Sequence, residues 1–382
     1  MRIQRILILF ALLLALLCSS QRVFAQAQEV PLPNNKFGIH ILFPSELSQA
    51  AKLVNSSGGD WGYVTIPIQA GDRDLVKWQA FMDDCRTYHL IPIIRLATEG
   101  DYFNTQVWRT PNENDVTDFA NFLNSLTWPT QTRYVTVFNE VNRSNEWGGH
   151  VDPAGYAQLL SFAASTFHSK SPDFFIISAG MDNGADTSST AMDEYSYFRA
   201  MHQAVPYVFD QIDGMGSHSY PNPAFLTPPT TMTRKSIASF QFEHSLISTF
   251  THKNLPIFIT ETGWTRDGLS DQIIGQYYAQ AFQTVWNDPN VIAVTPFLLL
   301  SGDGPFMQFS FLKPDGSPTQ MAQAYMSIPK PAGHPVLIQP VLAAETINNA
   351  KLPVKDFGAP ERSKNPVTAF VENLMSKWFF HG

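Results

Sequence analysis

Eight short apolar runs, each followed by a stretch with helical periodicity, restrict the fold of this sequence more than any other feature. The runs begin near Phe37, Trp61, Leu90, Arg133, Phe174, Phe209, Pro256 and Val291. Neighbouring runs start roughly 25 to 45 residues apart, which leaves room for one strand, one helix and two turns. Such units, repeated over about 300 residues, predict a (β/α)8 TIM barrel, an α/β fold whose parallel strands close into a ring.

A doubly wound open sheet is the main alternative to the barrel. Its first strand is ordinarily followed by a glycine-rich turn that binds phosphate. Here the first run continues from Ile39 to Pro44 without a glycine. The barrel is therefore the better interpretation of the strand and helix order.

The stretches between the runs carry helix-start signals and one apolar face each. Asp152-Pro153 is typical of an N-cap followed by proline in the first helical position, and Ser270 is a second N-cap candidate. Apolar residues recur at helical spacing in three of these stretches. After Asp152 they are Tyr156, Leu159, Leu160, Ala163 and Phe167, and after Ser270 they are Ile273, Ile274, Tyr277, Tyr278, Ala281 and Val285. The third set is Leu75, Trp78, Met82 and Cys85. These faces are expected to pack on the sheet.

The two ends of the chain differ from the predicted barrel domain, residues 27–329. Residues 1–25 combine early arginines, an apolar run and small residues near Ala25, as in a secretory signal peptide, and an uncleaved membrane anchor is the alternative. Residues 330–364 are predicted to be a poorly ordered linker. Residues 365–382 are predicted to form an amphipathic helix that docks on the barrel or contacts a partner or membrane surface.

Composition restricts the partners and the compartment of the protein. The 382-residue chain has a formal net charge of -8, and loss of residues 1–25 would remove three arginines and bring it to -11. An acidic protein is a poor match for nucleic acid. Cys85 would be the only cysteine left, so no intramolecular disulfide is expected. A secreted or cell-envelope location is predicted.

Two of the apolar runs end in a carboxylate, Glu140 after residues 134–139 and Glu261 after residues 256–260. A charge at the end of a buried strand is costly unless the protein uses it. The carboxyl ends of barrel strands meet on one face, where a pair of carboxylates can hydrolyse a glycosidic bond. Glu99 and Asp101, which follow the third run, are the main rivals for these roles.

The order of these motifs resembles the clan A glycoside hydrolases over roughly residues 36–328. In those barrels an Asn-Glu pair ends strand four and a glutamate nucleophile ends strand seven. The resemblance implies that Glu140 is the acid/base, that Glu261 is the nucleophile, and that Asn139 donates to the 2-hydroxyl of the sugar. It also implies oligo- or polysaccharide substrates and no cofactor.

Further residues at the predicted strand ends complete the candidate site. His218 and Tyr220 resemble the His-x-Tyr of strand six in several clan families, which implies that Tyr220 hydrogen-bonds the nucleophile. Arg95 ends the third run and is expected to pair with Glu261, and His40 ends the first. Two tryptophans, Trp264 and Trp147, follow the catalytic strands and are candidate faces for sugar rings. Weaker candidates for hydroxyl contacts are Asp182 and Asn183.

The sequence departs from the clan pattern at strand eight, where many members place a tryptophan below the sugar. The corresponding segment, residues 295–303, offers Phe297 and Asp303 instead. A metal site made by His40, His218 and a glutamate is a weak alternative, because scattered ligands lack metal-site spacing. The sequence therefore predicts an exported retaining glycoside hydrolase, and the rival is a catalytically silent barrel that binds carbohydrate at the cell surface.

Overall fold

The computed structural model describes residues 34–98, 107–302, 304 and 306–338. Several predictions fall outside these ranges: the signal segment 1–25, the rivals Glu99 and Asp101, Asp303, the linker from 339 onward and the helix 365–382. Among the described residues, no helix is both long enough and apolar enough to cross a membrane.

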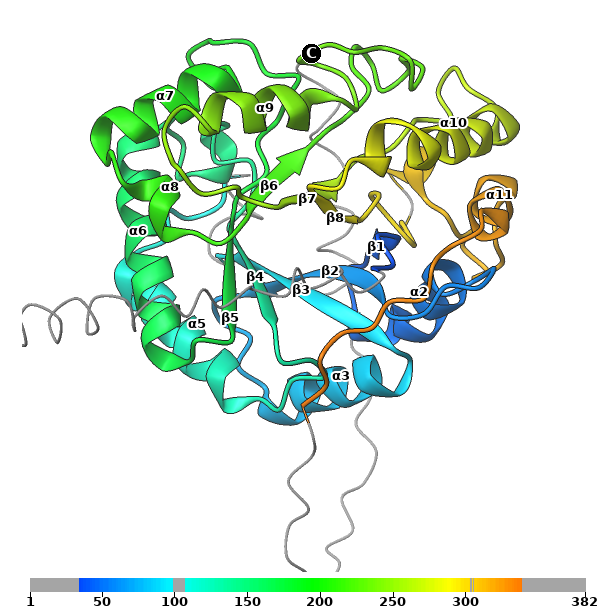
Figure 1. Ribbon diagram of the computed structural model, residues 1–382, viewed down its shortest axis with the longest axis horizontal. Helices are drawn as coiled ribbons and strands as arrows, with labels where there is room; N and C mark the ends of the chain where they lie inside the picture. Colours follow the sequence, from blue (N-terminus) through cyan, green and yellow to red (C-terminus); the bar gives the residue numbers. More distant parts are fainter. Residues whose placement is uncertain (1–33, 99–106, 303, 305, 339–382) are drawn as a thin grey trace, which may run out of the picture. The chain divides into compact units, whose positions relative to one another are not determined.

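A ring of parallel strands lies at the centre of the barrel (Figure 1). Within the described residues the strands are β1 Gly38–His40, β2 Gly62–Gln69, β3 Leu90–Ala97, β4 Arg133–Val137, β5 Phe174–Ser178, β6 Met215–His218, β7 Ile257–Glu261 and β8 Val291–Val294. They pair in parallel in the orders β1 to β5 and β6 to β8. Single bridges, Ile177 to Gly214 and Phe37 to Val294, join the two sheets. The predicted (β/α)8 barrel is confirmed.

Helices surround the ring on all sides in Figure 1. They are α2 Leu47–Val54, α3 Leu75–Thr87, α5 Glu113–Ser125, α6 Pro153–Lys170, α7 Glu194–Ala204, α8 Val208–Gln211, α9 Ser239–Ile247, α10 Asp271–Gln283 and α11 Gln320–Ser327. Short 3-10 turns lie at η1 Pro44–Glu46, η2 Ser144–Glu146, η3 Val285–Asn287 and η4 Met307–Phe309. The two expected N-caps are confirmed, because the side chains of Asp152 and Ser270 accept backbone hydrogen bonds within the first helical turn.

Two details differ from the expectations. The sixth run does not start a strand at Phe209, which lies in α8, and β6 begins only at Met215. Phe209 packs in the helix layer against Phe250, at 5.8 Å between ring centroids, so its apolar character serves a helix. Leu75, which opens α3, and Ile273, in the first turn of α10, are 52% and 37% exposed, so these two residues of the predicted apolar faces do not pack on the sheet; the other members of the Leu75 stripe are buried.

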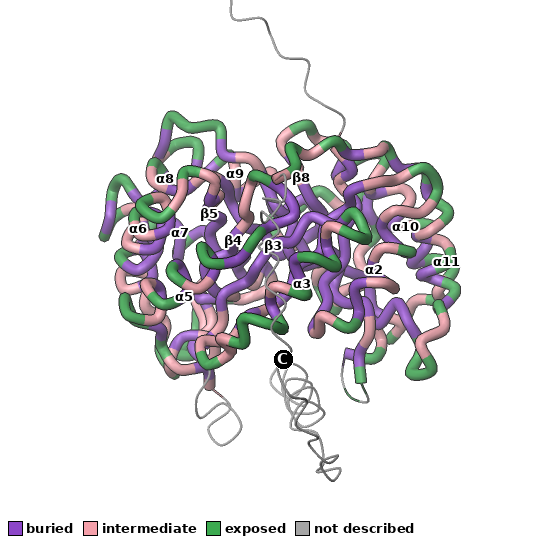
Figure 2. Tube along the Cα trace, turned by 90° about the horizontal axis from the view of Figure 1, so that it is seen from below, coloured by how far each residue is buried: buried purple, intermediate pink, exposed green. Residues whose placement is uncertain are grey.

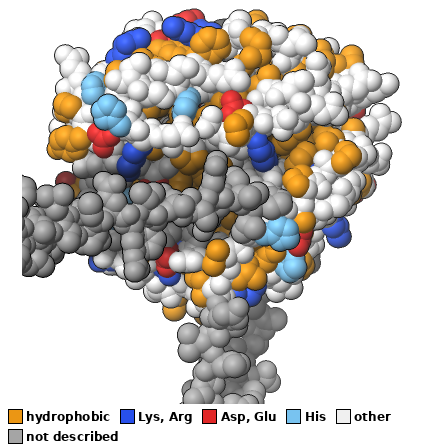
Figure 3. Space-filling view, in the orientation of Figure 1, with side chains coloured by type: hydrophobic (Ala, Val, Ile, Leu, Met, Phe, Trp, Pro, Cys, Tyr) orange, Lys and Arg blue, Asp and Glu red, His pale blue; other side chains and the backbone are white. Residues whose placement is uncertain are grey.

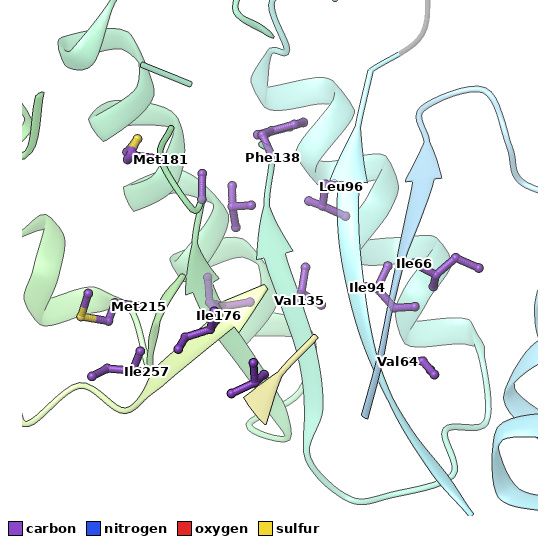
Figure 4. Packing of buried hydrophobic residues seen from close by; sticks show 14 of the residues in the cluster. Val64, Ile66, Ile94, Leu96, Val135, Phe138, Ile176, Met181, Met215 and Ile257 are labelled. Carbon is purple, nitrogen blue, oxygen red and sulfur yellow. The ribbon is translucent and has the colours of Figure 1, made fainter. Parts of the chain in front are cut away.

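Alternation along the strands produces two apolar layers. Val64 and Ile66 of β2, Ile94 of β3 and Val135 of β4 point outward and pack between sheet and helices (Figure 4). Figure 2 shows the resulting buried interior and exposed periphery. Because side chains alternate between the two faces of a strand, the residues that alternate with these outward-pointing ones face the inside of the barrel.

The inside of the barrel changes from aromatic to polar along the strands. Tyr134 of β4 and Phe258 of β7 meet across the barrel, with ring centroids 5.2 Å apart. One layer further on, the hydroxyls of Thr65 and Thr295 are hydrogen-bonded at 2.9 Å. Polar side chains at this depth mark the end of the packed core and the beginning of a site at the carboxyl ends of the strands.

The first part of the predicted linker packs on the opposite end of the barrel. Lys330 Nζ donates to the carbonyl oxygens of Tyr325 and Ile328, both at 2.9 Å. Gly333 N donates to Asp60 O at 2.8 Å, just before β2. The chain therefore continues as ordered structure past the expected boundary at residue 329, because these backbone and ammonium groups have partners on the barrel.

Gly216 sits where β6 approaches β5, and a Cβ atom there would collide with the carbonyl oxygen of Ser178. We expect Gly216→Ala to force the two strands apart, and to lower the free energy of unfolding by about 2–3 kcal/mol. Thermal unfolding followed by circular dichroism measures the effect. Gly71→Ala is the matched control, since a Cβ at that position has no neighbour within 4 Å. Equal midpoints for the two variants would contradict this account of barrel closure.

Candidate active site

Glu140 and Glu261 lie at the carboxyl ends of β4 and β7. Glu261 is the last residue of β7, and Glu140 follows the end of β4 by three residues. The chain leaves β4 through left-handed backbone at Phe138 and Glu140, with φ of 70° and 35°. Glu140 N donates to Gly180 O at 3.0 Å, which holds this turn against the end of β5. Left-handed non-glycine residues cost about 1–3 kcal/mol each and gather at functional sites.

Both oxygens of the Glu261 carboxyl receive hydrogen bonds. Tyr220 Oη donates to Oε2 at 3.0 Å, and Arg95 Nη1 donates to Oε1 at 3.3 Å. The same Arg95 nitrogen donates to Asn139 Oδ1 at 2.5 Å. Burial, and then the charge of Glu261, raise the pKa of Tyr220 well above its ordinary value, so this hydroxyl remains a donor. The predicted partners of Glu261 are thus present, and its negative charge is stabilised.

Glu140 is held in a different environment. Its Oε1 shares a 3.0 Å hydrogen bond with His218 Nδ1, and its Oε2 has no partner among the described residues. The side chain has no solvent exposure. Burial, and then the charge of Asp182, raise the pKa of Glu140 well above its ordinary value. Glu140 therefore keeps its proton where an exposed glutamate would lose it.

The two carboxyl groups meet around one imidazole ring. His218 Nδ1 lies 3.0 Å from Glu140 Oε1 and 3.9 Å from Glu261 Oε2. One atom of each of the three side chains lies within 4.8 Å of the other two. A shift in strand register between Ser217 and His218 places His218 opposite Glu261. Gly180 permits this approach, since a Cβ there would strike the His218 ring.

His40 and His218 are buried at the site and have lowered pKa values. Burial is the main cause for both, and the positive charge of Arg95 adds to it. His40 Nε2 lies 3.7 Å from Glu261 Oε1, beyond hydrogen-bond distance. Both rings are therefore neutral near pH 7 and add no positive charge to the site.

We expect His40 and His218 to titrate at a lower pH than the same residues in the unfolded chain. Long-range 1H–15N NMR spectra of the folded protein and of a urea-unfolded sample measure this difference. Because the unfolded chain takes up these protons first, the contribution of both rings to stability falls as the pH drops below about 6.5. Titration of either folded ring at or above the unfolded value would contradict its placement.

A pocket opens above Glu261 and encloses about 810 Å³ of space, open solvent at its mouth included. Its described lining consists of Arg95, Ala97, Thr98, Trp108, Pro111, Phe138, Asn139, Glu146, Tyr220, Phe225, Glu261, Phe297, Phe306 and Phe309. The wall is largely aromatic, as in sites that bind apolar faces of sugar rings. On the face shown in Figure 3, acidic and basic side chains are spread among uncharged ones.

The expectation that Trp264 and Trp147 present flat faces to sugars is wrong. Trp264 is fully buried and its Nε1 donates to Thr227 O at 2.8 Å. Trp147 is buried against Tyr156, with ring centroids 5.5 Å apart. Both indoles close the core behind the strand ends, which is the commonest place for large apolar rings.

The other candidates have mixed outcomes. Phe297 lines the pocket at the position after β8. Asp182 pairs with Arg143 at 2.6 Å, and the Asn183 side chain is buried, where it donates to Tyr220 O at 3.0 Å. His40 stands beside Glu261 but does not line the pocket. Asp182 and Asn183 therefore contact Arg143 and the backbone of Tyr220, and neither lines the pocket.

Several pocket residues were missed by sequence reasoning, namely Trp108, Glu146, Phe225, Phe306 and Phe309. All lie in loops between the strands and helices, where no periodicity predicts direction. Glu146 follows an asparagine, as Glu140 does, but it ends the 3-10 turn η2 and not an apolar strand, so the strand pattern does not point to it. Only the arrangement of the loops brings these side chains to the pocket.

Glu140, His218 and Glu261 are also donor types that bind divalent metals. Their atoms already serve one another and Tyr220 as hydrogen-bond partners. The permanent charge of Arg95 lies 3.3 Å from Glu261, where it opposes a second cation. The arrangement fits a hydrogen-bonded acid and base group better than a metal centre.

Comparison with known proteins adds the fold family. No protein-family model matches the chain, and no curated protein matches it. Among solved structures, a family 39 glycoside hydrolase from Bacteroides cellulosilyticus superposes with a TM-score of 0.56 at 16% identity, over 78% of this chain and 64% of that one.

Two other solved structures are similar. A β-xylosidase from Caulobacter crescentus has a TM-score of 0.55 at 15% identity and covers 77% of this chain and 68% of its own. A family 5 enzyme from Streptomyces cattleya, in complex with Manβ1-4GlcNAc, has a TM-score of 0.54 at 14% identity and covers 78% and 80%. The chain has the barrel fold of these glycoside hydrolases, which confirms the resemblance at the level of the fold.

Proposed function

We propose that this protein is an exported glycoside hydrolase that cleaves O-glycosidic bonds by a retaining double-displacement mechanism. The observation that carries the proposal is the convergence of Glu140 and Glu261, whose nearest donor atoms lie within 4.8 Å of each other and of His218. Retaining enzymes place their carboxyl groups about 5–5.5 Å apart, and inverting enzymes about 6.5–9.5 Å. This proximity is nearer to the retaining arrangement than to the inverting one and supports direct attack by one carboxylate.

Glu261 is the proposed nucleophile. Its carboxylate attacks the anomeric carbon, and the bond from that carbon to the leaving oxygen breaks, which leaves a glycosyl ester on Glu261. Arg95 and Tyr220 hold the two carboxylate oxygens in one orientation. Because Asn139 Oδ1 accepts from Arg95, the amide NH2 of Asn139 is its donor end, and the N–H that does not serve Glu146 is proposed to donate toward the sugar.

Glu140 is the proposed acid/base. Its raised pKa keeps the proton that the leaving oxygen takes up as the glycosidic bond breaks. The carboxylate formed in this step then removes a proton from the water that hydrolyses the ester. His218, which is neutral and bonded to Oε1, keeps the Glu140 side chain in place through both steps.

The substrate class follows from the pocket and from the structural neighbours. The aromatic residues of the pocket wall suit the apolar faces of sugar rings. The similar structures include a β-xylosidase and, at a TM-score of 0.51, an endo-β-1,3-glucanase from Sorangium cellulosum. A β-linked oligo- or polysaccharide is the proposed substrate. The proposal of export rests on the signal-like character of residues 1–25.

Replacement of either carboxylate separates the two roles. Glu261→Gln should lower kcat/KM for every glycoside by at least about a thousandfold, because no ester can form. Glu140→Gln should cost about 10²–10⁴-fold with poor leaving groups and much less with dinitrophenyl glycosides, which need no proton. Steady-state and burst kinetics, with glycosides of poor leaving groups and with dinitrophenyl glycosides, measure the difference between the two variants. Parent-like hydrolysis by both variants would refute the assignment.

The pH profile gives an independent check on Glu140. Since its pKa is raised, the alkaline limb of the kcat/KM profile should follow the loss of the Glu140 proton and lie at a higher pH than an exposed glutamate would give. The alkaline limb should disappear in Glu140→Gln assayed with a dinitrophenyl glycoside. An unchanged limb in that variant would assign it to another group.

The full burial of Glu140 and the phenylalanine after β8 favour one second candidate, a silent barrel that binds carbohydrate without cleaving it. Calorimetry with neutral oligosaccharides, run beside the turnover assay, separates the two. Binding without any turnover supports the silent barrel, whereas turnover that depends on Glu261 supports the hydrolase.

A further inference from the structure

A second carboxyl group lines the pocket beside Glu261 and has no role in the mechanism above. Glu146, the last residue of η2, lines the pocket together with Asn139 and Glu261. Unlike Glu140, which is fully buried, Glu146 is partly exposed. It is therefore a carboxyl group that a molecule in the pocket can reach from the mouth.

The backbone around Glu146 is tied down on both sides. Ser144 N donates to Thr190 O at 2.8 Å, and Trp108 N donates to Asn145 O at 2.8 Å. The next residue, Trp147, is buried and packs against Tyr156. Glu146 is thus presented by an ordered turn and held ready for a ligand, which reduces the entropy lost on binding.

The cations near Glu146 are engaged with other acids. Arg95 pairs with Glu261, and Arg143 pairs with Asp182 at 2.6 Å. The side chain of Asn139 hydrogen-bonds the Glu146 carboxyl, so that a chain of contacts runs from Arg95 through Asn139 to Glu146. Burial, and then the charge of Glu140, raise the pKa of Glu146 to about 7.

We propose that Glu146 is a substrate-binding residue that accepts hydrogen bonds from hydroxyl groups of the same sugar unit that Asn139 contacts. This inference rests on the proposed function, and it adds the substrate class, which is neutral sugars and not uronic acids. A carboxylate can accept from two neighbouring hydroxyls, and it repels a second carboxylate in a water-poor pocket. Repulsion between the carboxylates of Glu146 and of a uronic acid disfavours binding of the uronic acid more strongly than the loss of one hydrogen bond would.

The test compares Glu146→Gln with Glu113→Gln, each measured at pH 7.5. Glu113, like Glu146, directly follows an asparagine, but it is exposed at the start of α5. Glu113→Gln therefore controls for the loss of one negative charge. Substrates are aryl β-glycosides of neutral hexoses and pentoses and an aryl β-glucuronide. Circular dichroism and thermal unfolding confirm that both variants are folded.

We expect Glu146→Gln to raise KM for the neutral glycosides about tenfold with little change in kcat, and to reduce the preference for neutral over acidic glycosides by about tenfold. Glu113→Gln should match the parent. Parent-like KM and preference in Glu146→Gln would overturn the inference. A loss of kcat at constant KM would also overturn it, because that pattern belongs to a group that acts on the leaving oxygen.

A binding measurement keeps this test separate from the proposed function. If the parent cleaves no glycoside, calorimetry with neutral xylo-, cello- and laminari-oligosaccharides and with an oligouronide replaces kinetics. Neutral sugars that bind the parent but bind Glu146→Gln about tenfold more weakly would support the inference while hydrolysis fails. Equal affinity of both proteins, or no binding of any sugar to the parent, would overturn it.

Discussion

One guanidinium group, that of Arg95, holds together the acidic residues at the mouth of this barrel. It is nearly buried and donates to both Glu261 and Asn139. Its positive charge lowers the pKa of Glu140 and of Glu146 against the larger effect of burial, and it adds to the burial that lowers the pKa of His40 and His218. Several carboxyl groups in so small a space would repel one another without it. The remaining geometry of the site depends on this charge.

The barrel explains why such a group of charges is tolerated. Charges removed from water are costly unless they are paired and hydrogen-bonded. The inside of the barrel supplies donors from different strands, Arg95 from β3 and Tyr220 from the end of β6, around a carboxylate on β7. The outer apolar layer between sheet and helices holds these strands in register and so fixes the donors within hydrogen-bond reach.

The pocket is lined partly by residues at the rigid strand ends and partly by residues of the loops. The strand ends carry the groups that would act on a glycosidic bond, whereas the loops carry the aromatic wall and Glu146. Loops of a barrel vary without disturbing the core, and for this reason related barrels act on different sugars. The low identity to the similar structures, 16% or less for those compared above, agrees with a shared frame and different loops.

The apolar runs predicted the barrel, the carboxylates Glu140 and Glu261 and the place of Arg95, whereas Asn139, His218 and Tyr220 were predicted from the resemblance to the clan. The carboxyl ends of the parallel strands lie on one face of the barrel, and side chains along a strand alternate between inward and outward. The local pattern of the sequence therefore suffices to place a polar residue that ends an apolar run. The tertiary structure decided that Glu140 is fully buried, that Trp264 closes the core, and that Glu146 and the phenylalanines form the pocket. These outcomes depend on the paths of loops and on contacts between residues far apart in the chain, which no periodicity encodes.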